Sequence, residues 1–115
     1  MRIYVAGPYT GRSALQINAN VHDADVAGRE ILAMGHAPFV PHTMTRGWED
    51  DARFQHDPED LSTSDFLRMD FEWLRLCDGL LFLGPSPGAL AERALAEAIG
   101  IPVYESIEEI PDGAQ

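Results

Sequence analysis

The segment from Ser86 to Gly100, SPGALAERALAEAIG, constrains the fold of this 115-residue chain more than any other stretch. It follows the apolar run GLLFLG at residues 79–84 and precedes IPVY at residues 101–104. Ser86 suits a helix N-cap, Pro87 the first helical position and Gly100 the end of the helix. Strand, tight turn, helix and strand follow one another with little intervening chain, which predicts a βαβ unit.

The rest of the chain alternates between apolar runs and amphipathic stretches in the same way. Strands are predicted at residues 2–6, 36–40, 79–83 and 102–104, and helices between Ser13 and Gly35, after the caps at residues 62–64, and at Pro87–Ile99. The second helix is expected to bury a stripe made of Phe66, Met69, Trp73 and Leu76 or Cys77, with Asp70 beside it. One helical turn is expected after the last strand.

This alternation predicts a single α/β domain over residues 1–115, a three-layer sandwich of the flavodoxin-like or Rossmann-like kind. Right-handed crossovers place helices on both faces of a parallel sheet. We expect four to five strands in the order 2-1-3-4.

Composition excludes several classes of function. The formal net charge is −11 and all basic residues are arginine, which disfavours a nucleic acid polymer as partner. No apolar run approaches membrane-spanning length and no signal-peptide pattern opens the chain, so we expect a cytoplasmic protein that does not bind membranes. The single Cys77 and the spacing of the histidines form no metal pattern, so we expect no metal and no cofactor.

Two carboxylates are the candidate catalytic groups. Ligands of open parallel sheets sit beyond the C-terminal strand ends, where Ser86 and Gly88 begin a helix and Glu92 lies one turn further on. Asp70 flanks an apolar stripe, so its pKa is expected to be raised. Two carboxylates at one site suggest work on a glycosidic bond, and Tyr4 is placed to orient one of them. The alternatives are ordinary ones: solvated helix carboxylates and a tyrosine that only packs in the core.

Two loops are candidates for substrate binding. Gly7, Gly11 and Arg12 after the first strand form a plausible anion cradle, although the pattern is neither GxGxxG nor a P-loop. The polar stretch at residues 42–60 is long for so small a domain, and we expect it to border the site, with a short helical turn near Trp48. His42 lies in this loop, and Trp48 is placed either to stack on a base or to anchor the loop.

Three blocks together resemble the nucleoside 2-deoxyribosyltransferase-like superfamily. They are IYVAGPYTG (residues 3–11), RMDFEWLRLCDGLLFL (68–83) and SPGALAERALAEAIGIPVY (86–104). The second and third blocks are most similar to the 2′-deoxynucleoside 5′-monophosphate N-hydrolases, and they also resemble short, mostly uncharacterised bacterial and phage members.

The resemblance implies a role for each matching residue. Glu92 corresponds to the family's nucleophile, which attacks C1′ of the sugar and forms a glycosyl-enzyme intermediate. Tyr4 corresponds to the tyrosine that orients this glutamate, and Asp70 to the aspartate near the leaving base and the sugar. Ser86 corresponds to a serine that helps to hold the 5′-phosphate in the hydrolases, whereas the transferases commonly carry an aspartate there.

The resemblance also extends to backbone positions around the substrate. Gly7 and Gly88 correspond to sites of close backbone approach, and Pro8 and Thr10 stand where the hydrolases tend to have a serine and then an arginine. The expected substrate-binding residues are Gly7, Pro8, Thr10, Gly11, Arg12, His42, Trp48, Ser86 and Gly88.

The expected function is hydrolysis of the base–sugar bond of a nucleoside or deoxynucleoside 5′-monophosphate. Members of the superfamily are homo-oligomers, so the resemblance implies a homodimer or a higher oligomer. Two alternatives remain open: a deoxyribosyltransferase that exchanges nucleobases, and a nucleotide-binding module without turnover.

Overall fold

The computed structural model describes residues 1–9, 13–45 and 63–113 of the chain. Its centre is a parallel sheet in the order β2-β1-β3-β4, which confirms the predicted strand order. The strands are β1 (Arg2–Ala6), β2 (Ala37–Phe39), β3 (Gly79–Phe82) and β4 (Val103–Tyr104).

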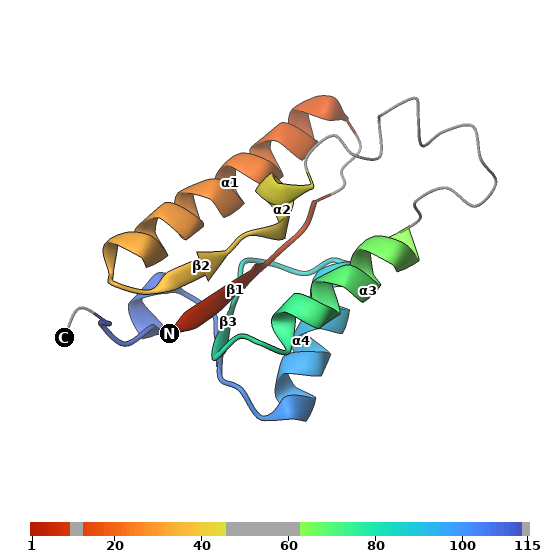
Figure 1. The fold of residues 1–115 in the computed structure, drawn as a ribbon. Coiled ribbons are helices and arrows are strands. Elements are labelled where there is room, and N and C mark those ends of the chain that lie inside the picture. Colours follow the sequence, from red (N-terminus) through yellow and green to blue (C-terminus); the bar gives the residue numbers. More distant parts are fainter. Residues whose placement is uncertain (10–12, 46–62, 114–115) are drawn as a thin grey trace.

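Helices cover both faces of the sheet, as Figure 1 shows. One side carries α1 (Ala14–Ala33), the short α2 (Pro41–Met44) and the 3-10 turn η3 (Ile107–Glu109). The other side carries α3 (Thr63–Leu74) and α4 (Pro87–Ile99). The sequence predicted that an irregular loop follows the second strand after Pro41. The strand does end before Pro41, but this proline also begins α2, because proline suits the first turn of a helix.

Two apolar layers form because successive residues of a strand point to opposite faces of the sheet. Ile3 and Val5 of β1 pack with α1, whereas Tyr4 and Ala6 pack with α3 and α4. β1 is a central strand with a neighbour on each side, so all four side chains are fully buried. Tyr4 is the largest side chain in the fully buried set, and its hydroxyl is the polar atom that this core must satisfy.

The helix ends follow the capping residues of the sequence. The Ser13 side chain accepts a hydrogen bond from the backbone N–H of Gln16 at 3.2 Å, and α1 gives way to Gly35 at a φ of 92°. The buried face of α1 includes Gly28, where an added Cβ would lie 2.6 Å from Cγ2 of Val40. A glycine is therefore required for α1 to approach β2 this closely.

The apolar stripe predicted for the α3 segment is confirmed at Cys77, one of its two alternative ends, and is wrong at Trp73. Trp73 and Leu76 are 45% and 57% exposed, whereas Leu74 is fully buried and Cys77 nearly so. Asp70, Leu74 and Cys77 follow a spacing of four and three residues, which places them on one helical face. Asp70 therefore belongs to the inward face itself. Cys77 is a free, buried thiol, as the sequence indicated.

The N-terminal edge of the sheet is closed by Asp78. Its carboxylate accepts a hydrogen bond from the backbone N–H of Arg2 at 2.8 Å, and its own N–H donates to the Arg2 carbonyl at 2.7 Å. These contacts confirm that Asp78 begins a strand at the edge away from the candidate site. No helix in the described parts of the chain combines the length and the apolar character needed to cross a membrane.

Candidate functional site

The centre of the candidate site is a hydrogen bond between the sheet and α4. The Tyr4 hydroxyl, on the central strand, donates to Oε2 of Glu92, which lies in the second turn of α4. Tyr4 is fully buried and Glu92 is only 6% exposed, so this glutamate is not the solvated helix residue that its type alone would suggest. The contact joins two of the three residues expected to be catalytic.

An aromatic stack holds the Tyr4 ring in place. Its centroid lies 5.6 Å from that of Phe39 with the planes 28° apart, and Phe39 lies 5.3 Å from Trp73 with the planes 25° apart. The stack runs from the core to the half-exposed Trp73 on α3, so the phenol has little freedom to turn away from Glu92. Sequence reasoning missed Phe39; the parallel register that pairs Tyr4 with Phe39 is the information that finds it.

Asp70 completes the cluster from α3. Its Oδ1 atom is buried and has no hydrogen-bond partner among the described residues. Burial raises the pKa of Asp70 to about 6, and the nearby Tyr4 hydroxyl opposes part of that rise. A buried carboxyl oxygen without a partner is costly, and the cost disappears if a ligand or a proton occupies it.

The two carboxyl groups, Asp70 and Glu92, form an interacting pair. Burial raises the pKa of Glu92 to about 8; the Tyr4 hydrogen bond lowers it, and the charge of Asp70 raises it. Burial, reinforced by these carboxylates, also raises the pKa of Tyr4 well above its ordinary value, so the phenol remains a proton donor at neutral pH. Because burial raises the pKa of both carboxyl groups, the pair retains a proton in the free protein near neutral pH.

The N-terminus of α4 provides a different kind of surface. The Ser86 hydroxyl accepts a hydrogen bond from the backbone N–H of Ala89 at 3.0 Å, which is an N-cap, and Pro87 follows as predicted. An added Cβ at Gly88 would meet nothing within 4 Å. Pro87 has no N–H, and the N–H groups of Ala89 and Leu90 donate to Ser86, so this helix end offers an anion the Gly88 N–H, the Ser86 hydroxyl, the helix dipole and open space.

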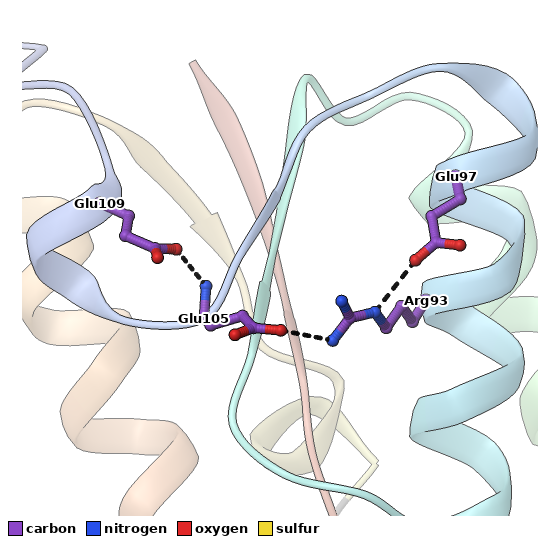
Figure 2. Close-up of polar contacts among 4 residues, drawn as sticks. All are labelled: Arg93, Glu97, Glu105 and Glu109. Atoms are coloured by element: carbon purple, nitrogen blue, oxygen red, sulfur yellow. Dashed lines mark hydrogen bonds and ion pairs between the residues drawn. The ribbon is translucent and has the colours of Figure 1, made fainter.

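The outer face of α4 is held by Arg93, as Figure 2 shows. Its guanidinium pairs with Glu97 and with Glu105, each at 3.0 Å, and lies 4.9 Å from the centre of the Phe82 ring. The backbone N–H of Glu105 in turn donates to the carboxylate of Glu109 at 2.6 Å. Arg93 follows Glu92 directly and makes its ion pairs on the outer face, whereas Glu92 shares the buried face of α4 with Ala89 and Ala96.

The loop after β1 lies against α2 and β3. Nε2 of His42 lies 3.1 Å from the Gly7 carbonyl and 3.0 Å from the Pro8 carbonyl, and the residue is 6% exposed. A Cβ added at Gly7 would lie 3.0 Å from Cβ of Leu83, so this glycine permits close packing of β1 against the end of β3. His42, one of the expected binding residues, therefore has its Nε2 atom turned toward the protein backbone.

Four of the expected binding residues, Thr10, Gly11, Arg12 and Trp48, lie outside the described residues. Within residues 1–9, 13–45 and 63–113, no group of three or more histidine, cysteine, aspartate or glutamate side chains is arranged to hold a metal ion. The described site is thus two carboxyls, a phenol, an aromatic stack and a helix N-terminus.

The sequence was compared with models of known protein families. Residues 1–106 match the family model described as Domain of unknown function (DUF7768). Among curated proteins, none matches this sequence. Because the family model covers all four strands and the helices between them, the chain belongs to the DUF7768 domain family.

Proposed function

We propose that the chain is an N-glycosidase that cleaves the base from a nucleoside or deoxynucleoside 5′-monophosphate in the cytoplasm. The observation that carries this proposal is the hydrogen bond from Tyr4 to the buried Glu92 beside Asp70. Burying a glutamate against a core tyrosine, with a second carboxyl group beside it, lowers the stability of the fold. The same arrangement is useful for acid–base and nucleophilic chemistry. The resemblance to the nucleoside 2-deoxyribosyltransferase-like superfamily supports the same assignment.

The reaction proceeds in two steps. A carboxylate oxygen of Glu92 attacks C1′ of the sugar, the C1′–N bond breaks, and its electron pair leaves with the base, which takes up a proton assisted by Asp70. Water then attacks C1′, the bond to Glu92 breaks, and the proton released by water goes to Asp70. Sugar phosphate and free base are the products.

The protonation state of the pair determines how the first step begins. Burial raises the pKa of both Glu92 and Asp70, so the pair retains a proton that Glu92 has to release before it can attack. Moving this proton to Asp70 frees the carboxylate of Glu92 and puts the proton where the departing base needs it. The positive charge that develops at C1′ favours this transfer, because it stabilises an ionised Glu92.

The 5′-phosphate is assigned to the N-terminus of α4. Ser86 caps this helix, and Gly88 leaves the approach to the backbone open. Helix N-termini with free approach bind phosphate through N–H groups and the helix dipole. Under this proposal nucleoside monophosphates are better substrates than the corresponding nucleosides.

The test is release of free base from a panel of ribonucleoside and deoxyribonucleoside monophosphates and their nucleosides, followed by chromatography. Glu92→Gln keeps the acceptor for Tyr4 and removes the nucleophile, and we expect it to reduce release at least about 1,000-fold. Glu97→Gln is the matched control, since Glu97 lies on the same helix with its side chain 59% exposed. It should retain the wild-type rate.

A second readout identifies the intermediate. A nucleotide with fluorine at C2′ of the sugar slows breakdown of the glycosyl-enzyme, so mass spectrometry should find the sugar phosphate attached to Glu92. If base is released only when an acceptor base is added, the chain is a transferase and not a hydrolase. Nucleotide binding without release in either assay would replace both with a binding module.

A further inference from the structure

His42 is buried against the backbone of the loop that follows β1. It is the second residue of α2, and its Nε2 atom lies 3.1 Å from the Gly7 carbonyl and 3.0 Å from the Pro8 carbonyl. Carbonyl oxygens only accept hydrogen bonds, so Nε2 must carry the proton that is shared between them. These contacts define the tautomer of the ring.

The other ring nitrogen has no role in this network. Nδ1 of His42 is buried and has no hydrogen-bond partner among the described residues. Burial lowers the pKa of His42, although both carbonyls oppose that effect. The neutral ring with its proton on Nε2 is thus the form that the surroundings accommodate, because a second proton would be buried without an acceptor.

Other elements hold the same loop from different directions. Nδ2 of Asn20, on α1, donates to the Tyr9 carbonyl at 3.2 Å, and the Tyr9 ring contacts the His42 ring edge-on at 5.7 Å. On the sheet side, Gly7 packs against Leu83. The loop is therefore held by α1, α2 and the end of β3, and His42 provides the only hydrogen bonds from α2 to it among the described residues.

We propose that His42 is a positioning residue that fixes the backbone at Gly7 and Pro8 through its Nε2–H tautomer. The loop lies at the C-terminal end of the central strand, where the proposed function places substrate, and the inference rests on that function for its effect on turnover. His42 acts through the backbone: its ring is 6% exposed and its donor is already committed to two carbonyls.

The first test concerns the ring itself and needs no substrate. In nitrogen-15 NMR of the wild-type protein at neutral pH, the ring signals that disappear in the His42→Gln variant should be those of a neutral ring protonated at Nε2. A ring protonated at Nδ1, or at both nitrogens, would overturn the assignment.

The second test compares two substitutions at this position. His42→Gln keeps an amide donor near the position of Nε2, whereas His42→Leu fills the space without a donor. We expect His42→Leu to shift the backbone amide signals of Gly7 and Tyr9 and to raise KM about tenfold with a smaller change in kcat, because two buried carbonyls lose their donor. We expect His42→Gln to stay within about threefold of wild type.

Two controls separate this proposal from the proposed function. His22→Leu alters an exposed histidine on α1 and should change neither readout. Glu92→Gln should abolish turnover while leaving the Gly7 and Tyr9 signals in place. If wild type releases no base, the proposed function fails while the NMR comparison still decides the role of His42. If His42→Leu and His42→Gln show the same Gly7 and Tyr9 signals and the same KM, the proposal that His42 positions this loop is refuted.

Discussion

Replacing Tyr4 with phenylalanine removes one hydroxyl from the carboxyl pair and keeps the ring that stacks on Phe39. The hydroxyl donates to Glu92, and a phenol that donates to a carboxylate stabilises the ionised form of that group. Its removal therefore favours the protonated form. The Tyr4→Phe variant should have a higher pKa at Glu92 than the wild-type protein.

The size of the change follows from burial. A hydrogen bond to a charged group contributes about 1.5 to 3 kcal/mol, and one pKa unit corresponds to about 1.4 kcal/mol. Because Glu92 is only 6% exposed, solvent does little to replace the lost donor. The pKa of Glu92 should rise from about 8 to about 9 or 10.

Carbon-13 NMR of glutamate side-chain carboxyl groups measures this directly. The signal of Glu92 is identified by its loss in Glu92→Gln, and its titration is followed from pH 5 to pH 10 in wild type and Tyr4→Phe. Tyr104→Phe is the control, since it removes the same hydroxyl from the last strand and should leave the titration unchanged. An apparent pKa in Tyr4→Phe that equals or lies below the wild-type value would refute the reasoning.

Three further experiments test the fold around the site. Glu92→Gln should flatten the dependence of the unfolding free energy on pH, which urea unfolding at several pH values measures. The pKa of Glu92 is raised from 4.5 to about 8 in the folded state, so the group favours folding below about pH 4.5, and this contribution is lost as the pH rises to about 8. In the same assay, Leu74→Ala should lower the free energy of unfolding by about 2 to 5 kcal/mol, whereas Leu76→Ala should change it by less than about 0.5 kcal/mol. Similar losses in the two variants would mean that α3 is rotated differently. Gly88→Ala should leave thermal stability nearly unchanged, whereas Gly28→Ala should lower it clearly, and equal melting temperatures for the two would contradict the packing at residue 28.

The parts of the fold that could be predicted from the sequence are those marked by residues that start or end a helix or strand. The helix Pro87–Ile99 was predicted with its observed bounds, because Ser86, Pro87 and Gly100 each favour one position at a helix end. The strand order was predictable because right-handed crossovers between parallel strands leave few topologies. The Pro41–Met44 helix was not predicted, since four residues are too few to show a helical period.

The candidate site was predicted less completely than the fold. Apolar residues at positions 66, 69 and 73 favoured one rotation of α3, but packing against the sheet buries Leu74 and leaves Trp73 half exposed. A pattern of side-chain types does not distinguish these rotations, because the inward face also holds the polar Asp70. The contacts of His42 were beyond sequence reasoning too, since backbone carbonyls look alike in every sequence.

The separation of Tyr4 and Glu92 along the chain has a consequence for biosynthesis. The two residues are 88 positions apart, and β1 also needs β3 as a neighbour before it is covered on both edges. A chain emerging from the ribosome therefore exposes the apolar side chains of β1 long before the partners of that strand exist. The Tyr4–Glu92 contact can form only after α4 has been synthesised, so the first strand made contributes to one of the last contacts to assemble.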